Sequence, residues 1–314
     1  MGWLRTVGQG AVRGLRAFLK LMVIVAPVYT FVTILKYTPV LEGFARLMAP
    51  LMRIFRLPGE AAMALILGNF INIYASLGAI TALKITGAQL TVLSLMILIS
   101  HSQILETAVF FQIRAKWWLL WLIRLVLSFI AGIGLSALIV PAGTYRTTAA
   151  DFAELRQVFV LLPAVKSWGL GLLNTGVKMV LVLLGIFILL ELARRYGVLD
   201  RILRGLRRVI GFMGYSEDAG MPWLAGNVFG IVFGAGLIVE SVQESRLTPK
   251  QVTLVATFLA ICHGLFEDTA IFLVLGANFF YIVVPRIVLA VIVTWVLSRV
   301  LKDKPALTSG SKVV

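Results

Sequence analysis

Residues 100–110 read SHSQILETAVF, and residues 262–272 read CHGLFEDTAIF. The two stretches share a histidine, an acidic residue followed by threonine and alanine, and a phenylalanine, all at the same spacing. Two unrelated apolar segments would share leucine, valine and isoleucine, but they would not share polar residues in one register. The pair therefore indicates an internal repeat.

The repeat extends outward from these stretches over most of the chain. Further matched pairs are Lys20 with Lys178, Gly68-Asn69 with Gly226-Asn227, Thr86 with Thr248, Gln89 with Gln251, and Arg124 with Arg286. Four extra residues enter the second copy near residues 240–246. We therefore expect a basic segment at residues 1–19, a first repeat at 20–140, a connector at 141–177, a second repeat at 178–301 and a polar tail at 302–314.

The composition places both repeats in a membrane. Of 314 residues, 60% are hydrophobic and only 14% are charged, and the mean hydropathy is +0.98. A soluble domain carries about 25% charged residues. Several apolar runs approach the ~20 residues that cross a ~30 Å hydrocarbon core. The predicted class is an all-α, multi-pass membrane protein.

The charge distribution indicates which partners to expect. The formal charge is +15, but the basic residues gather at the ends of apolar runs, as membrane orientation and anionic headgroups require. We expect contact with the lipid bilayer and no nucleic acid. The single cysteine, Cys262, permits no internal disulfide or thiolate cluster. The sequence shows no P-loop or other enzyme motif, so we expect no enzyme activity and no cofactor.

Each repeat reads as the same series of helical segments. A spanning helix is followed by an amphipathic basic segment suited to the membrane interface, two interrupted apolar segments and an aromatic-led helix. These are expected at 21–35, 40–56, 61–83, 89–113 and 117–140, and again at 179–192, 198–212, 219–239, 251–275 and 279–301. Thr86 and Thr248 resemble helix N-caps, each with glutamine three residues later. The interrupted segments suggest broken or re-entrant helices.

The relative orientation of the repeats follows from the number of crossings in each. The second amphipathic segment is more basic than the first, which favours an inverted topology with that segment in the cytoplasm. Four full crossings per repeat would instead give parallel copies. We expect Trp117, Trp118, Trp121, Trp223 and Trp295 to lie at the membrane interface as anchors.

Asparagines and small residues interrupt the first apolar segment of each pair. Asn69, Asn72 and Ser76 lie near Gly68 and Gly78, and Asn227 lies in a glycine-rich counterpart. The glycines alone favour close helix packing. The matched Asn69 and Asn227 favour a helix break or a surface that binds a polar solute.

Ionisable residues interrupt the second segment of each pair. Buried charges are costly in a membrane and are candidates for a functional site. Here they suit a proton relay, a cation site or substrate contacts; the alternative is that they only join the two halves. His263 and Glu267 are four apart and would share a helix face, whereas His101 and Glu106 would meet only if the helix breaks. The candidates are His101, Gln103, Glu106, Thr107, His263, Glu267, Asp268 and Thr269.

Two arginines lie well inside the final helix of each repeat. Arg124 and Arg286 are expected to neutralise Glu106 and Asp268, because a buried charge needs a partner. The alternative is that they meet an anionic substrate.

With the repeat laid out, the Gly-Asn pairs and the two quoted stretches resemble the gate, or nucleoside-recognition, domain. This domain occurs in spore maturation proteins A and B, in the membrane part of the ferrous-iron transporter B family and, more distantly, in concentrative nucleoside transporters. The resemblance covers nearly the whole chain and implies a transport role in the cytoplasmic (inner) membrane of a prokaryote. Unlike the iron transporters, this chain has no attached GTPase domain and one soft ligand, Cys262.

The sequence therefore predicts a secondary-active transporter or permease for a small polar solute, nucleoside-like or a small organic anion. Its site would lie between the two repeats, and histidine and carboxylate protonation would couple transport to a proton gradient. One alternative is an iron-like divalent-cation permease, in which the histidines and acids are ligands. Another is a non-transporting membrane scaffold. The sequence leaves the metal, the substrate and a homo-oligomeric state open.

Overall fold

The computed structural model of the chain describes residues 2–143, 161–198, 201, 205, 210–231, 238 and 247–302. This part of the chain is helical and contains no β-strand. The predicted all-α class is therefore confirmed. Most of the expected polar tail, and residues 144–160 of the expected connector, lie outside the described residues.

The helices that the structure describes follow the order that the sequence pattern predicts, whereas most of the expected segment at 198–212 and the end of that at 219–239 lie outside the described residues. The first half contains α1 (Gly2–Lys36), α2 (Pro39–Arg53), α3 (Ala61–Phe70), α4 (Ile73–Ala82), α5 (Gly87–Ser100), α6 (Gln103–Gln112) and α7 (Trp117–Ile139). The second half contains α9 (Leu161–Arg195), a short 3₁₀ turn (Glu217–Ala219), α11 (Gly220–Phe229), α13 (Pro249–Ile261), α14 (Glu267–Leu275) and α15 (Phe279–Val300).

Four helical segments of the described chain are long and apolar enough to cross a membrane. They are Gly87–Gln112, Trp117–Ile139, Pro163–Ala193 and Phe279–Val300. Shorter apolar helices accompany them at Val25–Leu35, Ala61–Phe70, Ile73–Ala82 and Pro249–Ile261. The mixture of full-length and short apolar helices agrees with the predicted multi-pass membrane protein.

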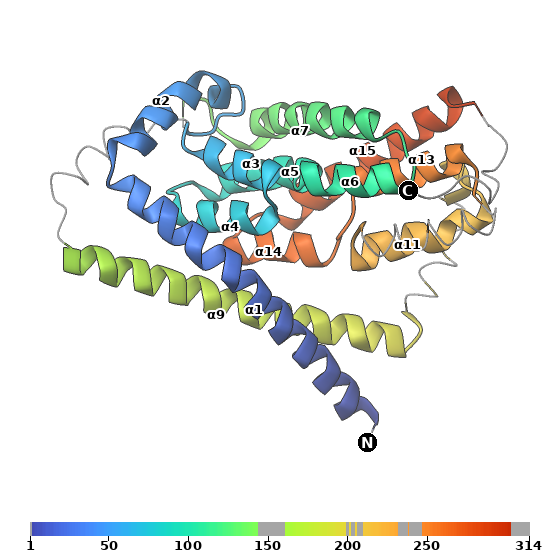
Figure 1. The fold of residues 1–314 in the computed structure, drawn as a ribbon, viewed down its shortest axis with the longest axis horizontal. Coiled ribbons are helices and arrows are strands. Elements are labelled where there is room, and N and C mark those ends of the chain that lie inside the picture. Colours follow the sequence, from blue (N-terminus) through green and yellow to red (C-terminus); the bar gives the residue numbers. More distant parts are fainter. Residues whose placement is uncertain are drawn as a thin grey trace.

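Helices α1 and α9 are longer than the sequence suggests. Each has 35 residues, so the expected boundaries at residues 20 and 178 fall inside continuous helices. The basic residues 2–19 extend the first apolar run, and residues 161–177 of the expected connector are helical. The two helices cross in opposite chain directions and lie along one side of the molecule (Figure 1).

Glycines allow α1 and α9 to approach closely. A Cβ atom on Gly10 would lie 2.6 Å from the Cα atom of Ile188, and one on Gly14 would lie 3.0 Å from the backbone of Leu183. Small residues at such crossings let helix backbones pack in contact. An ion pair between Arg13 and Glu191 at 2.7 Å adds a polar link.

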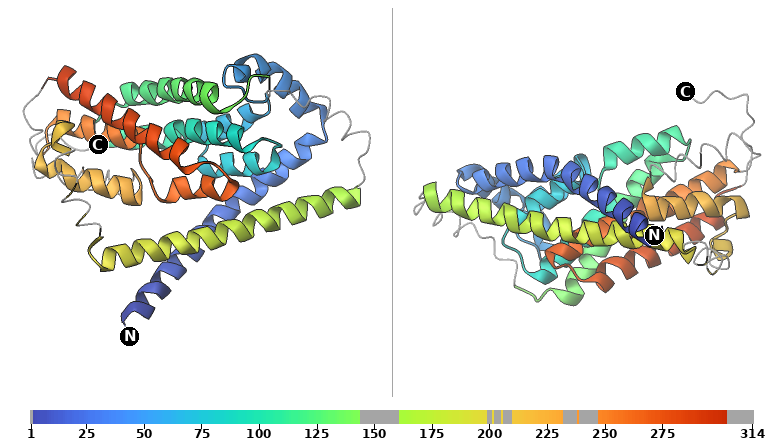
Figure 2. Two further views of the ribbon diagram at one scale, coloured as in Figure 1. Left: turned by 180° about the vertical axis from the view of Figure 1, so that it is seen from behind. Right: turned by 90° about the horizontal axis from the view of Figure 1, so that it is seen from below.

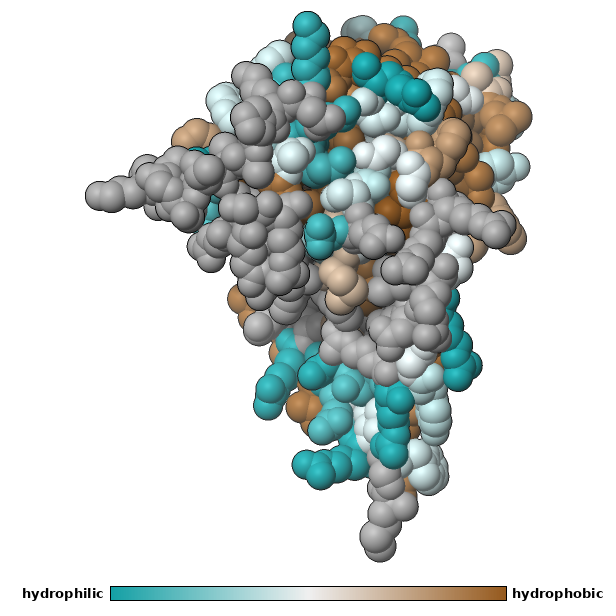
Figure 3. All heavy atoms as spheres, turned by 90° about the vertical axis from the view of Figure 1, so that its right-hand side faces the viewer, coloured by the Kyte–Doolittle hydropathy of each residue, from teal (hydrophilic) through white to brown (hydrophobic). Residues whose placement is uncertain are grey.

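Hydrophilic residues gather where α1 begins and α9 ends. Figure 3 views this end of the molecule, with hydrophilic side chains gathered over its lower part and a mixture of hydrophobic and hydrophilic ones above. The exposed arginines there include Arg5, Arg13 and Arg195. This distribution suits a helix end that leaves the hydrocarbon region.

The predicted interruptions are confirmed as breaks between separate helices. Asn72 lies between α3 and α4 and caps α4, because its side-chain oxygen accepts from the amides of Tyr74 and Ala75. Thr86 caps α5 in a reciprocal capping box with Gln89, and Thr248 caps α13. α11 ends at Gly230, which has a φ of +89°.

Helices α5 and α13 form the centre of the fold. Nearly every side chain of α5 and α13 is buried, as expected for helices surrounded by other helices rather than by lipid. α7 packs beside α5 and α15 beside α13, while α14 contacts α9. Figure 2 shows the same arrangement of helices from behind and from below.

Equivalent helices of the two halves run in opposite directions. In Figure 1, α5, α6 and α15 run from left to right, whereas α7, α13 and α14 run from right to left. The pairs α5 with α13, α6 with α14 and α7 with α15 are those that the repeat matches. These directions agree with an inverted arrangement, while the repeat itself stays a prediction.

One predicted interface tryptophan is not at the surface. Trp117, Trp118, Trp121 and Trp295 are exposed, but Trp223 is buried. Trp223 packs edge-on against Phe258 with ring centroids 5.2 Å apart. The prediction for Trp223 is wrong because α11 packs against α13 inside the fold.

Candidate functional site

The candidate site forms where two helix breaks meet. Between α5 and α6 the chain turns at His101 and Ser102, and between α13 and α14 it turns at residues 262–266. Ser102 and Gly264, matched in the repeat, both adopt the left-handed region, with φ of +52° and +54°. The break lets side chains that a continuous helix would separate converge.

Four side chains converge between the breaks, and we call them the central cluster: His101, Glu106, His263 and Asp268. The Nε2 atoms of both histidines lie 3.4 Å from Oε1 of Glu106 and 3.9 Å from Oδ2 of Asp268. The two imidazole centroids are 5.0 Å apart. Each half of the chain thus supplies one histidine and one carboxylate.

Burial makes the central cluster unusual. His101, His263 and Glu106 are each 4% exposed, and the Asp268 side chain is 13% exposed. Taking such groups out of water is costly unless they are paired or bind a ligand. The central cluster is therefore the strongest candidate site in the described chain.

Both histidines are oriented by the same backbone contact. Nδ1 of His101 lies 3.1 Å from the carbonyl oxygen of Ile97, and Nδ1 of His263 lies 2.6 Å from that of Leu259. A carbonyl oxygen only accepts, so each Nδ1 carries the hydrogen. Each Nε2 then faces the carboxylates.

The buried arginines hold the helix breaks. Arg124 donates to the carbonyls of Ile99 and His101 and lies 2.9 Å from Oε2 of Glu106. Arg286 donates to the His263 carbonyl at 2.7 Å and to the Thr269 hydroxyl at 3.2 Å. Arg124 thus lies beside the acid with which we expected it to pair. Arg286 instead contacts the backbone and a threonine.

Glu267 does not share a helix face with His263, contrary to expectation. α14 starts only at Glu267, and His263 lies in the preceding break, so the helical spacing of four does not apply. Glu267 instead interacts electrostatically with Tyr74 of α4. The sequence pattern did not single out Tyr74, although a tyrosine within an apolar helix needs a partner for its hydroxyl.

The Gly-Asn pairs support the breaks through their backbone. The Gly68 carbonyl accepts from the Ser102 amide at 2.8 Å, and the Asn227 carbonyl accepts from the Leu265 amide at 3.1 Å. The side-chain nitrogens of Asn69 and Asn227 donate to the carbonyls of Leu65 and Trp223 at 2.8 Å each. The asparagines thus lie next to the site and stabilise the helix ends.

Several predicted solute-binding residues carry buried polar atoms without a hydrogen-bond partner in the described chain. They are Asn69 Oδ1, Ser76 Oγ, both amide atoms of Gln103, and Thr107 Oγ1. Such atoms are rare unless water or a ligand satisfies them. Asn72 differs, because its side-chain oxygen already caps α4.

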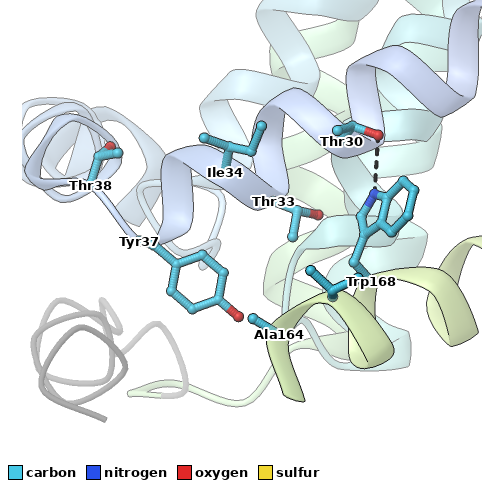
Figure 4. A pocket seen from close by; sticks show the side chains of 8 residues that line it. Thr30, Thr33, Ile34, Tyr37, Thr38, Ala164 and Trp168 are labelled. Carbon is cyan, nitrogen blue, oxygen red and sulfur yellow. Dashed lines mark hydrogen bonds between the residues drawn. The ribbon is translucent and has the colours of Figure 1, made fainter. Parts of the chain in front are cut away.

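A separate cavity of about 390 Å³ lies between α1 and α9. Its lining includes Thr30, Tyr37 and Trp168 (Figure 4), and the Trp168 indole donates to the Thr30 hydroxyl at 3.0 Å. The lining is largely apolar and includes none of the predicted site residues. This cavity is distinct from the central cluster.

Fold and site together define a multi-helical membrane protein whose buried ionisable groups meet at broken helices. Residues 18–117 match the Gate family, described as nucleoside recognition, which confirms the predicted resemblance over this part of the chain. The chain is also 27% identical over 290 residues to the uncharacterized membrane protein YvoD of Bacillus subtilis (strain 168), covering 90% of this chain and 91% of the relative. No solved structure matches the chain significantly.

Proposed function

We propose that this protein is a permease or secondary-active transporter, and that its solute binds at the central cluster between the two halves. The observation that carries the proposal is the convergence of two histidines and two carboxylates at paired helix breaks. Broken helices with exposed backbone are a common way to build a transport site in a membrane. The match of residues 18–117 to the Gate family supports a transport-related role.

The unpartnered polar atoms near the breaks support a polar solute. Gln103 and Thr107 lie on the helix that carries Glu106, and Asn69 and Ser76 lie on α3 and α4. Together they offer both donors and acceptors, which a nucleoside-like solute or a small organic acid would use. The histidines and carboxylates can exchange protons, so we include proton coupling in the proposal.

A non-transporting scaffold is the alternative from another class. In a scaffold, the central cluster would only join the two halves. A scaffold needs no solute, so it leaves the unpartnered atoms of Gln103 and Thr107 unexplained.

A ligand screen followed by uptake tests the proposal. The purified protein would be heated with nucleosides, small carboxylates, phosphates and divalent ions, because a ligand that binds the folded state raises Tm. The stabilising compound would then be offered to liposomes that contain the protein. We expect one class to stabilise the protein and to enter the liposomes. Stabilisation by no class and uptake equal to that of empty liposomes would favour the scaffold.

A further inference from the structure

We propose that the central cluster binds one divalent transition-metal ion, with His101, His263, Glu106 and Asp268 as its ligands. The inference has two parts, binding of the ion and its transport. Only the second part, that the ion is the transported solute, rests on the proposed function. Binding of the ion follows from the geometry alone.

The histidine tautomers leave two unshared electron pairs at the centre. Because each Nδ1–H donates to a carbonyl of the preceding helical turn, each neutral imidazole presents Nε2 as an acceptor. Metal-binding histidines almost always donate their other ring nitrogen in this way, which fixes the ring and its tautomer. Here α5 and α13 supply the same support to both rings.

The carboxylates add further electron pairs at the same point. Glu106 uses Oε2 for Arg124 and turns Oε1 toward both histidines. Asp268 turns Oδ2 toward the same two nitrogens. Acceptors that face one another in a buried site repel unless a cation or a proton lies between them. Arg124 contacts the other oxygen of Glu106, Oε2, and Arg286 donates to the His263 carbonyl, so the contacts of neither arginine place it between these acceptor atoms.

The separations fit a single small ion. A four-coordinate metal with ligands at about 2.0–2.2 Å sets those ligands about 3.3–3.6 Å apart. Both histidines lie 3.4 Å from Glu106 and 3.9 Å from Asp268. One ligand atom from each of His101, His263 and Asp268 lies within 4.8 Å of the other two. The four histidine-to-carboxylate separations are thus within a few tenths of an ångström of the range that a single ion requires.

The ligand types select the class of ion. Imidazole nitrogen favours transition metals such as Zn²⁺ and Fe²⁺, whereas Ca²⁺ and Mg²⁺ prefer sites made only of oxygen. Arg124 and Arg286 also offset the two carboxylate charges, which weakens binding of hard ions that depend on net negative charge. Because each half supplies two ligands, the ion would join the halves at their breaks.

Metal binding by the full-length protein tests this inference. The protein would be stripped with a chelator and dialysed against Zn²⁺, and bound zinc and Tm would be measured. We expect about one zinc per chain and a raised Tm. Asp268→Asn and His263→Ala should weaken binding at least about tenfold. Asp218→Asn, an exposed aspartate outside the central cluster, should bind as the unchanged protein does.

A cysteine variant keeps the inference testable if those variants fold poorly. In a Cys262→Ala background, His101→Cys retains a ligand atom and should give a thiolate-to-cobalt charge-transfer band when Co²⁺ is added. No saturable zinc binding by the unchanged protein, or unaltered binding in both Asp268→Asn and His263→Ala, would overturn the inference. A proton shared within the central cluster would produce that result.

Uptake separates this inference from the proposed function. Zinc binding without zinc entry into protein-containing liposomes would keep the metal site and contradict transport of the ion. Entry of a nucleoside or an organic acid without any metal binding would keep the transport function and overturn the metal site.

Discussion

Arg124 and Arg286 connect the backbone of the helix breaks with the charges beside them. Both are fully buried, and each donates to the carbonyl of the histidine in the nearby break. The final carbonyls of a helix have no partner within it and need another donor. The arginines therefore stabilise the breaks that bring the central cluster together.

Replacing Arg124 should destabilise the fold strongly. Arg124→Met would leave Glu106 as a buried charge without its cation, a loss of about 3–5 kcal/mol. The free energy of unfolding in detergent measures the effect. Arg299→Met is the control, because the exposed Arg299 lies 5.6 Å above the Trp295 ring. This substitution should lower the free energy of unfolding by about 1 kcal/mol at most. Equal stability of the two variants would contradict this role for Arg124.

Ser102 and Gly264 share a left-handed backbone but should respond differently to substitution. A non-glycine residue there costs about 1–2 kcal/mol, so Ser102→Gly should keep or raise stability. Gly264→Ala should lower the free energy of unfolding by more than about 1 kcal/mol, because a Cβ there would collide with the Asp268 carboxylate. Thermal unfolding of both variants provides the measurement, and an unchanged Gly264→Ala protein would be inconsistent with the structure.

At the scale of the helix, the sequence predicts the breaks better than the lengths. Asn72 and Thr86 are strong caps, so the starts of α4 and α5 follow from local chemistry. Residues 2–19 were predicted to be a separate basic segment because their charged residues interrupt the apolar pattern that marks the rest of α1. The contact between α1 and α9, which the sequence does not reveal, explains why α1 begins as early as Gly2.

The site was also predictable only in part. The four members of the central cluster stood out because ionisable residues are rare in apolar segments. The partner of Glu267 did not, because Tyr74 comes from a helix nearly 200 positions away in the sequence. The backbone role of Arg286 depends on the path of the broken chain, which residue spacing does not determine.

The crossing of α1 and α9 leads to a prediction about two nearby glycines. Gly10→Ala should destabilise the protein by more than about 1 kcal/mol, because its Cβ would meet the α9 backbone. Gly8→Ala meets no atom within 4 Å and should raise stability by up to about 1 kcal/mol through helix propensity. Thermal unfolding of the two variants compares them. The same effect at both positions would show that the crossing does not depend on close packing at Gly10.

At the scale of the whole molecule, opposite helix directions in the two halves bring the two histidine-containing breaks face to face. Neither half alone contains the complete central cluster, since each supplies one histidine and one carboxylate. The arrangement suits a site that opens alternately to either side of a membrane.

The inverted arrangement predicts the sides on which two helices begin. α7 and α15 run in opposite directions (Figure 1), so Lys116 and Asn278, just before their first residues, should lie on opposite membrane faces. In a Cys262→Ala background, an impermeant maleimide added to intact cells should label only one of Lys116→Cys and Asn278→Cys. The other should react after lysis. Labelling of both from the same side would favour parallel repeats.

Uptake into liposomes tests most directly whether the central cluster is a transport site. The solute would be the compound that stabilises the purified protein. The variant would be Glu106→Gln. The control would be Glu42→Gln, because Glu42 pairs with Arg46 outside the central cluster. Loss of a contact to a charged group is worth about 1.5–3 kcal/mol, so Glu106→Gln should take up the solute at least about tenfold more slowly at low concentration. Glu42→Gln should match the unchanged protein. Equal uptake by all three would contradict a transport site at the central cluster.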